Sequence, residues 1–406
     1  MKRFRAYPVA WVQIGLKIVA ALSLGWGAWT NMEAQRLVWL GTLPGGRASR
    51  AFGISADGRV VVGWSRDANF QVRAFRWENG VMLNLDTSGG DRSVAYGASQ
   101  NGSVVVGEVR LPTGVERAFR WWNGQMQLLG SVRSGARDLS ANGDIVVGWA
   151  QLPNGQYRAF RWVNGQMTSL GTLGGQRSEA NGVSADGRFV VGMATNASEA
   201  WRAFRWDAQS GVMQDLGDLG RGVAVAYDVS ADGRVVVGGA FNPQLFGSAF
   251  RWLDGVMEDL GTLGGNWSEA YGVSADGRVV VGVSHDANGW WRAFRWTPQR
   301  GMEDLNSLFA AWLTDGSWLE AAYAVSADGH RIVGYGYNVA SGRYEAFLVD
   351  TRIEGDVNDD GCVDDADLLI ILLAFGSGNP NADVNGDGIV DDADLLITLL
   401  NFGTGC

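Results

Sequence analysis

The chain has 406 residues and carries one sequence unit seven times, which limits the possible folds more than any other feature. The clearest part of the unit is a tetrapeptide of the type S-A-D-G. Its serines are Ser55, Ser99, Ser140, Ser184, Ser230, Ser274 and Ser326. Successive serines are 44, 41, 44, 46, 44 and 52 residues apart. A period in the mid-forties, with several short apolar runs in each unit, is typical of a β-propeller blade.

Each unit contains four short segments that predict β-strands. In the sixth copy these segments are residues 270–274, 278–282, 292–296 and 301–305. The second is the β-branched run R-V-V-V-G, which suits a pleated surface, and the third places Phe294 and Trp296 on one face. D-G and N-G pairs between the segments favour tight hairpin turns. No sustained helical period interrupts the repeats, so we predict an all-β architecture for this region.

The two ends of the series indicate a closed ring. Residues 37–41 look like a fourth strand with no first three before it, and residues 346–350 look like a third strand with no fourth after it. If these two segments pair, seven complete blades result and no sheet edge is left open. The alternative is an open solenoid, which would leave an orphan strand at each end.

Residues 1–34 have the features of a signal peptide. Lys2, Arg3 and Arg5 form a basic start, and residues 18–29 form an apolar run of the expected length. The alternative, an uncleaved membrane anchor, is disfavoured because twelve residues are short for a membrane span. We therefore expect a secreted, extracellular protein that is cleaved near Ala34 and keeps no stable membrane span.

The rest of the chain divides by charge into a propeller at residues 37–350, a linker at 351–355 and a tail at 356–406. The tail contains eleven Asp and no Lys, Arg or Glu, whereas the whole chain has a net charge of −10. Residues 1–355 therefore sum to about +1 and are nearly neutral. No basic cluster indicates a nucleic-acid partner.

The acidic residues of the tail form two copies of a twelve-residue loop, 356–367 and 383–394. Each copy has oxygen-bearing side chains at positions 1, 3, 5, 9 and 12 and Gly at position 6, a spacing that can wrap six to eight oxygen ligands around Ca²⁺. We predict two Ca²⁺ ions as cofactors. The expected ligands are Asp356, Asn358, Asp360, the carbonyl of Cys362, Asp364 through water and Asp367, then Asp383, Asn385, Asp387, the carbonyl of Ile389, Asp391 and Asp394.

An apolar helix is predicted after each loop, at residues 368–375 and 395–402. A disordered acidic tail is the alternative, but such tails lack two well-placed apolar helices.

Residues 356–406 resemble a type I dockerin. The resemblance lies in the doubled D-x-N-x-D-G-x-V-D-x-x-D loop and in Asp at position 12. It implies Ca²⁺-dependent folding and docking onto a cohesin-like protein, often within extracellular polysaccharide breakdown. Partner contacts in that family centre on loop positions 10 and 11, which are Asp365, Ala366, Asp392 and Ala393 in this chain.

The propeller region resembles the HAF-type extracellular repeat of bacteria. The motifs that carry this resemblance are D-L-G-T-L-G-G (259–265), G-V-S-A-D-G (272–277), V-V-G (280–282) and A-F-R-W (293–296). The resemblance implies a secreted, extracellular bacterial repeat protein and brings no established reaction with it.

Signals for catalysis are weak. His285 and His330 lie in different copies and neither has the context of a catalytic triad. Glu269, Asp286 and Glu199 are possible members of a carboxylate pair for glycoside hydrolysis, although no spacing indicates that they meet.

The arginine of A-F-R-W is predicted to be structural, with an acceptor nearby, because an unpaired buried Arg would be costly. The equivalent residues are Arg76, Arg120, Arg161, Arg205, Arg251 and Arg295, with Leu348 in the last copy.

The loops between the second and third strands vary among the copies and carry the candidate ligand-binding aromatics. These are Phe70, Tyr157, Trp201, Phe246, Trp290 and Trp291. They could stack on a carbohydrate or anchor a cell-surface partner; the alternative is that they tuck against neighbouring blades. The sequence favours a non-catalytic binding or scaffold protein. The alternative is a component of polysaccharide breakdown with glycoside hydrolase activity in the propeller.

A disulfide is predicted between Cys362 and Cys406, the two cysteines of the chain. An oxidising compartment and a small domain both favour such a bond. It would close a loop of roughly 44 residues, worth about 3–4 kcal/mol in the chain-entropy model. The alternatives are a free thiol at Cys362 and an intermolecular bond through Cys406. The predicted fold is thus an all-β seven-bladed β-propeller followed by a small α-helical domain with paired calcium loops.

Overall fold

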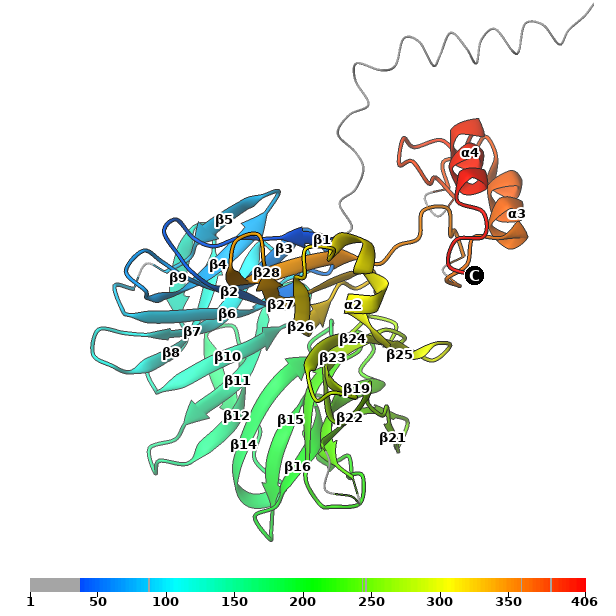
Figure 1. The fold of residues 1–406 in the computed structure, drawn as a ribbon. Helices are drawn as coiled ribbons and strands as arrows, with labels where there is room; N and C mark the ends of the chain where they lie inside the picture. Colours follow the sequence, from blue (N-terminus) through cyan, green and yellow to red (C-terminus); the bar gives the residue numbers. More distant parts are fainter. Residues whose placement is uncertain (1–36, 87, 243, 245–246, 359, 380–381) are drawn as a thin grey trace, which may run out of the picture. The chain divides into compact units, whose positions relative to one another are not determined.

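The computed structural model describes residues 37–86, 88–242, 244, 247–358, 360–379 and 382–406. The predicted signal peptide and the candidate residue Phe246 lie outside these ranges. Within the described residues, a group of four antiparallel strands recurs seven times, and Figure 1 shows the groups following one another around a ring. We number these groups units 1 to 7 in the order in which their first strands appear in the chain.

The strands take the same four places in each unit. The first strands are β2 (Ser49–Ile54), β6 (Arg92–Ala98), β10 (Ser134–Leu139), β14 (Gly174–Val183), β18 (Ala224–Val229), β22 (Gly264–Val273) and β26 (Trp318–Val325). The second strands are β3 (Val60–Arg66), β7 (Val104–Arg110), β11 (Ile145–Gln151), β15 (Phe189–Asn196), β19 (Val235–Phe241), β23 (Val280–Asp286) and β27 (Arg331–Asn338).

The remaining strands complete the units. The third strands are β4 (Val72–Glu78), β8 (Glu116–Trp122), β12 (Tyr157–Val163), β16 (Trp201–Asp207), β20 (Gly247–Leu253), β24 (Trp291–Thr297) and β28 (Arg343–Asp350). The fourth strands are β5 (Val81–Asn84), β9 (Gln125–Leu128), β13 (Gln166–Ser169), β17 (Met213–Asp215), β21 (Val256–Asp259), β25 (Gly301–Asp304) and β1 (Leu37–Trp39). Single parallel bridges also join β4 to β6 and β20 to β22.

The first and last strands of the ring pair as the closure hypothesis expects. β1 runs antiparallel to β28, with Leu37 opposite Val349 and Trp39 opposite Phe347. At the inner end of the ring, the N–H of Ala327 in unit 7 donates to the carbonyl of Ala56 in unit 1 over 3.1 Å. The N-terminal strand β1 therefore completes unit 7, and unit 7 contacts unit 1 through the turn that carries Ala327.

Buried apolar side chains between neighbouring units explain the repeated motifs. The phenylalanine of each A-F-R-W segment is fully buried; these residues are Phe75, Phe119, Phe160, Phe204, Phe250, Phe294 and Phe347. The glycine of V-V-G allows the first strand to approach closely. At Gly282, an added Cβ would lie 2.0 Å from the carbonyl oxygen of Glu269, so no larger residue fits.

Five of the six arginines of A-F-R-W bind the next unit, which confirms their predicted structural role: Arg76, Arg120, Arg161, Arg205 and Arg251. The sixth, Arg295, lies 3.8 Å from Glu303 of its own unit. The Nε atoms of Arg76, Arg120 and Arg161 donate to the carbonyls of Gly102, Gly143 and Gly187 over 3.1 to 3.3 Å. Each acceptor is the glycine of the next S-A-D-G turn.

Unit 7 has Leu348 at this position and reaches the next unit from another residue. Its Arg331 donates through Nη1 to the carbonyl of Gly58 in unit 1 over 3.1 Å. The link between units is therefore kept at the closure of the ring although the arginine has moved to another strand.

The long insertion of the seventh copy forms two short helices, α2 (Leu305–Leu308) and η1 (Ala310–Trp312). Asp304 caps α2 because its side chain accepts a hydrogen bond from the N–H of Asn306. Leu305 and Phe309 are buried against Leu319, so the insertion joins the apolar core.

The C-terminal region contains two further helices, α3 (Asp365–Ala374) and α4 (Asp392–Leu400). Both begin three residues before the predicted starts, because Asp364 with Asp367, and Asp391 with Asp394, form capping boxes that extend the first turn. The predicted disulfide between Cys362 and Cys406 is confirmed, with Cα atoms 4.6 Å apart. Among the residues described, no helix has the length and apolar character needed to cross a membrane.

Candidate functional site

Seven residues that the sequence analysis did not single out surround the axis of the ring. They occupy the third position before the serine of each S-A-D-G turn and are Phe52, Tyr96, Arg137, Asn181, Tyr227, Tyr271 and Tyr323. Each lies where the pairing between the first and second strands shifts register, as Tyr271 does between Ala270 and Gly272. A bulge of this kind re-aims the side chain away from the sheet.

The aromatic members of this set contact one another around five consecutive units. Ring centroids lie 5.2 Å apart for Tyr227 and Tyr271, 4.9 Å for Tyr271 and Tyr323, 4.9 Å for Tyr323 and Phe52, and 5.5 Å for Phe52 and Tyr96. These distances are within the range of favourable aromatic pairs. The rings therefore form a continuous aromatic layer, which we call the channel layer.

An ion cluster adjoins the channel layer at units 2 and 3. The buried carboxylate of Glu108 accepts hydrogen bonds from Arg92 at 2.8 Å and from the hydroxyl of Tyr96 at 3.2 Å, and it lies 3.4 Å from Nη1 of Arg137. The guanidinium of Arg137 also lies 4.4 Å from the ring centroid of Tyr96. A buried carboxylate with several charged and polar partners is a structural arrangement that rigidifies this side of the channel.

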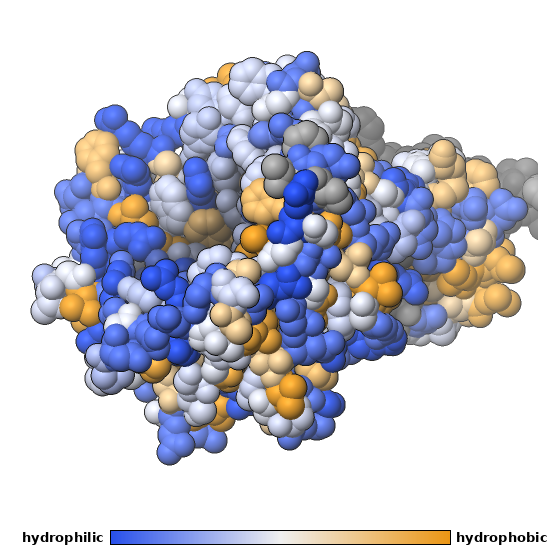
Figure 2. All heavy atoms as spheres, turned by 90° about the horizontal axis from the view of Figure 1, so that it is seen from below, coloured by the Kyte–Doolittle hydropathy of each residue, from blue (hydrophilic) through white to orange (hydrophobic). Residues whose placement is uncertain are grey.

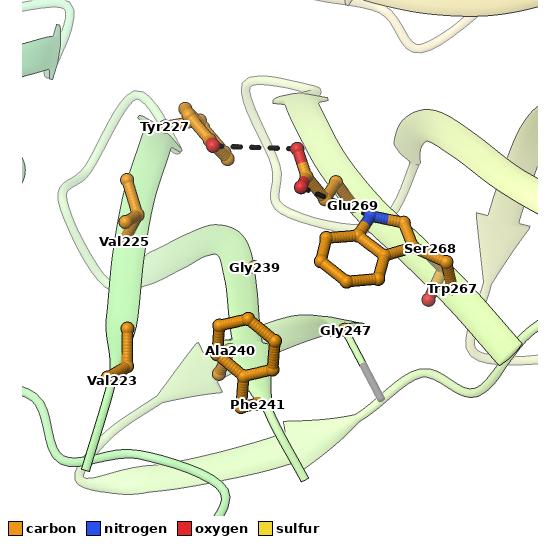
Figure 3. Close-up of a pocket in the computed structure, with 10 residues that line it drawn as sticks. All are labelled: Val223, Val225, Tyr227, Gly239, Ala240, Phe241, Gly247, Trp267, Ser268 and Glu269. Atoms are coloured by element: carbon orange, nitrogen blue, oxygen red, sulfur yellow. Dashed lines mark hydrogen bonds between the residues drawn. The ribbon is translucent and has the colours of Figure 1, made fainter. Parts of the chain in front are cut away.

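A second carboxylate, Glu269, lies in a pocket between units 5 and 6. It accepts hydrogen bonds from the hydroxyl of Tyr227 at 3.5 Å and from Nε1 of Trp267 at 3.2 Å (Figure 3). The hydroxyl of Tyr271 donates a third hydrogen bond to it, at 2.7 Å. Burial, and then the charge of Glu269, raise the pKa of both tyrosines, so their hydroxyls remain protonated donors at neutral pH. The pocket is lined by Val223, Val225, Tyr227, Gly239, Ala240, Phe241, Gly247, Trp267, Ser268 and Glu269.

Two partly buried carboxyl groups, Asp138 and Asp228, lie on the first strands of units 3 and 5. Each accepts a backbone N–H from the following unit: Val183 donates to Asp138 and Val273 donates to Asp228, both over 2.9 Å. Burial raises the pKa of Asp138 to about 7 and that of Asp228 to about 6, and the charge of Asp228 adds to the rise at Asp138. Their backbone partners indicate a role in packing one unit against the next.

The predicted aromatic loop residues are found in different surroundings. Trp290 and Phe70 are the most exposed, at 64% and 54%, although the guanidinium of Arg47 lies over the Phe70 ring. Tyr157 and Trp201 are partly buried.

Two of the loop aromatics pack against groups within their own unit. The hydroxyl of Tyr157 accepts a hydrogen bond from Arg133, and its ring packs on Trp149. Trp291 packs on His285, with ring centroids 3.9 Å apart. In the view of Figure 2, apolar residues in orange lie in small groups among hydrophilic residues in blue.

The residues considered for catalysis have separate partners. Asp286 pairs with Arg292, and Glu199 accepts the N–H of Gln176, whereas Glu269 is held by the pocket residues. His285 lies at the end of β23, and His330 lies in the turn before β27, which is at the opposite end of a second strand. The structure therefore does not bring these candidate groups together.

The two predicted calcium loops have the same internal hydrogen bonds. Asp356 at position 1 accepts the N–H of Gly361 at position 6, and Asp383 likewise accepts that of Gly388. The side chain at position 3 accepts the N–H of position 5, and the side chain at position 5 accepts that of position 7, in both loops. These bonds fold each loop back around its own side-chain oxygens.

The carboxylates at position 12 behave differently from the others. Asp367 is buried and accepts the N–H groups of Val357, Asn358 and Asp364, and Asp394 makes the equivalent bonds in the second loop. Within the described part of the chain, which leaves out Asp359, no group of three or more His, Cys, Asp or Glu side chains is gathered as a metal site. The donors are nonetheless hard oxygens, the type that Ca²⁺ prefers.

The predicted partner-binding positions lie in the first turns of α3 and α4 and are exposed; they are Asp365, Ala366, Asp392 and Ala393. The structure adds a feature that the sequence analysis missed. Three leucines of each helix are exposed at equivalent positions 27 residues apart: Leu369, Leu372 and Leu373 on α3, and Leu396, Leu399 and Leu400 on α4. Leu373 and Leu400 are 80% and 77% exposed. This exposure makes the leucines candidates for a contact surface.

The strand arrangement defines a mostly-β protein of the β-propeller type, and comparison with solved structures agrees with this class. The oligogalacturonate lyase of Vibrio parahaemolyticus matches with a TM-score of 0.54 at 9% identity, over 79% of this chain and 95% of the lyase chain. At this identity the match shows the fold alone.

Two TolB structures also match. The TolB protein of Agrobacterium tumefaciens has a TM-score of 0.41 at 15% identity, over 76% of this chain and 91% of that one. The TolB of Acinetobacter baumannii has a TM-score of 0.42 at 13% identity, over 69% and 76%. No family model and no curated protein matches the sequence.

Proposed function

We propose that the chain is a secreted, non-catalytic binding or scaffold protein. In this proposal the seven units are the blades of a closed seven-bladed propeller of the HAF type, which recognises a carbohydrate or cell-surface ligand. The region after the linker, residues 356–406, is a dockerin-like domain that binds two Ca²⁺ ions and attaches the propeller to a cohesin-like partner.

The observation that carries the proposal is the twofold repetition of the C-terminal region. Two loops with the same hydrogen bonds are followed by two helices that expose the same leucines. Burying such leucines against a partner would gain about 25 cal/mol for each Å² of apolar surface removed from water. Ca²⁺ would hold the loops, and the loops would hold the helices in the orientation that presents the leucines.

Glycan cleavage is the alternative function, and the similarity in fold to the lyase is the reason to consider it. The geometry does not favour it, because Glu269, Asp286 and Glu199 have separate partners. Hydrolysis by paired carboxylates needs two such groups facing one substrate.

Attachment is tested with the full-length chain and immobilised type I cohesin modules, measured by biolayer interferometry. We expect binding in Ca²⁺ that is lost in chelator. The double variant Leu373→Asp/Leu400→Asp should lose at least about tenfold in affinity, because charges cannot enter an apolar interface without cost. Leu83→Asp, an exposed leucine of β5, is the matched control and should bind normally. Absence of Ca²⁺-dependent binding to the cohesins would contradict the docking role.

Catalysis is tested separately by incubating the same protein with a panel of polysaccharides. We expect no new reducing ends and no unsaturated products. Turnover of any of these polysaccharides would overturn the non-catalytic proposal.

A further inference from the structure

The pocket at Glu269 exists because unit 5 lacks two side chains that the other units possess. The first is at Gly239, which follows the glycine of V-V-G on β19 and pairs with Val225 of β18. In the other six units the same position is held by larger residues: Trp64, Glu108, Trp149, Met193, Val283 and Tyr335. In two of them the side chain reaches the following unit, since Glu108 pairs with Arg137 and Tyr335 lies under Arg50. At Gly239 no side chain takes this space, and the side chain of Glu269 from unit 6 lies against the glycine, with its Cγ 3.2 Å from where a Cβ would stand.

The second missing side chain is at Gly247, the first residue of β20. The equivalent residues of the other units are Val72, Glu116, Tyr157, Trp201, Trp291 and Tyr344. A Cβ atom at Gly247 would lie 2.6 Å from Cε2 of Trp267, so the indole of unit 6 lies directly against this glycine. Gly239 and Gly247 of unit 5 therefore make room for the pocket and for the indole of Trp267, which forms one of its aromatic walls (Figure 3).

The pocket is lined by one negatively charged side chain, and its other walls are mostly aromatic and apolar. Tyr227, Phe241 and Trp267 supply aromatic rings, and the Phe241 and Trp267 rings meet edge to face with centroids 5.7 Å apart. Glu269 supplies the only charge among the ten lining residues, all of which the structure describes. Its position is fixed by three donors, so the negative charge is preorganised.

Few other polar groups are available to a ligand in this pocket. Ser268 already donates to the carbonyl of Gly261 at 2.6 Å and accepts the N–H of Ala249 at 2.8 Å. A sugar ring with several hydroxyls would leave most of them without partners, and such burial costs free energy. An anionic ligand would meet the charge of Glu269 with no basic residue to offset it. A compact organic cation needs only one anion and the faces of aromatic rings.

We propose that this pocket binds the alkylammonium group of a small molecule, with Glu269 as counter-ion and Tyr227, Phe241 and Trp267 as the aromatic wall. This inference deepens the proposed ligand-binding role of the propeller and rests on it. It does not involve the calcium loops or the exposed leucines of α3 and α4.

The experiment titrates full-length protein with choline by isothermal calorimetry and with 3,3-dimethyl-1-butanol, a neutral molecule of nearly the same shape. We expect choline to bind with a Kd of roughly 0.1–1 mM, as suits a single small group, and the neutral analogue to bind at least about tenfold more weakly. Gly239→Met introduces the methionine that unit 4 has at the equivalent position, Met193, and should fill the pocket. Glu269→Gln keeps the shape but removes the charge. Each should weaken choline at least about tenfold.

The matched control is Glu179→Gln, which changes the same register position in unit 4, outside the pocket. It should leave choline binding unchanged. Thermal melting shows whether Gly239→Met is folded; if it is not, Glu269→Gln alone decides the question.

Three results would overturn the proposal. One is no binding of choline, another is equal binding of the neutral analogue, and the third is choline binding that neither variant weakens. Glucose, galactose and galacturonate are titrated in parallel. Binding of one of these sugars that Gly239→Met abolishes would replace the cation with a sugar and leave the binding role of the propeller intact. Loss of cohesin docking with choline binding retained would instead contradict only the attachment role.

Discussion

Single carboxyl groups tie unit 3 to unit 4 and unit 5 to unit 6. Asp138 and Asp228 accept backbone N–H groups of the following units, and burial raises the pKa of both carboxyl groups. A carboxyl group whose pKa is raised in the folded chain holds its proton more tightly there than in the unfolded chain. The unfolded chain then carries fewer protons, so the free energy of unfolding falls as the pH rises.

This linkage predicts a pH dependence of stability. The contribution of Asp138 should be fully present below about pH 4, the ordinary value for Asp, and lost as the pH rises toward its folded-state pKa of about 7. Asp138→Asn should flatten the dependence by up to about 1.4 kcal/mol per pH unit, the value for one proton. Chemical denaturation at several pH values between about 4 and 7 measures the free energy of unfolding and hence this slope. Asp144→Asn, at an exposed carboxylate, should keep the wild-type slope, and an unchanged slope in Asp138→Asn would contradict this reading.

At the same scale, some residues could be assigned from the sequence and others could not. The arginines of A-F-R-W were correctly read as structural, because a repeated charge on a buried strand requires a repeated acceptor. The channel layer was missed because Tyr271 and its equivalents lie at bulges, where the two-residue alternation of a strand is broken. The one signal of the channel layer in the sequence is an aromatic residue three positions before the serine of S-A-D-G, which occurs in five of the seven copies.

At the scale of elements, the strands and turns of the repeats were predictable because local sequence determines them. S-A-D-G forms the same turn each time: in unit 4, Ser184 donates to Asp186 over 2.6 Å and accepts the N–H of Phe189. The exposed leucines of α3 and α4 were not predictable, since an apolar helix in a sequence does not reveal which of its sides remains uncovered. The pocket also depends on four strands from two units, which no single repeat encodes.

The disulfide links two elements of the C-terminal region, the first predicted calcium loop and the end of the chain. Cys406→Ser should lower the stability of this region by about 3–4 kcal/mol through loss of loop closure. Because Cys362 occupies position 7 of the first loop, the variant should weaken Ca²⁺ binding at that loop more than at the second. Calcium titrations of Asp383→Ala and Asp356→Ala backgrounds, each with and without Cys406→Ser, separate the two loops. Equal weakening of both loops would argue against this coupling.

At the scale of the whole molecule, closure of the ring depends on three residues from the start of the described chain. β1 supplies the fourth strand of unit 7 and covers the edge of β28. Deleting residues 1–39 should expose that edge and cause aggregation or a loss of thermal stability, because an unpaired strand can recruit another chain. A shorter deletion of residues 1–36 is the control and should remain monomeric. Size-exclusion chromatography and calorimetry compare the two; identical behaviour would mean that closure is unimportant for stability.

The binding of Ca²⁺ to the two C-terminal loops is the central claim of the proposed function. Isothermal calorimetry of the chelator-treated, full-length protein measures it most directly. We expect two ions per chain and a melting transition of the C-terminal region that appears only with Ca²⁺, since the metal holds together carboxylates that otherwise repel one another. Asp356→Ala/Asp383→Ala should bind none, while the propeller transition stays unchanged. Absence of calcium binding by the wild-type chain, or an unmoved C-terminal transition in chelator, would contradict the account.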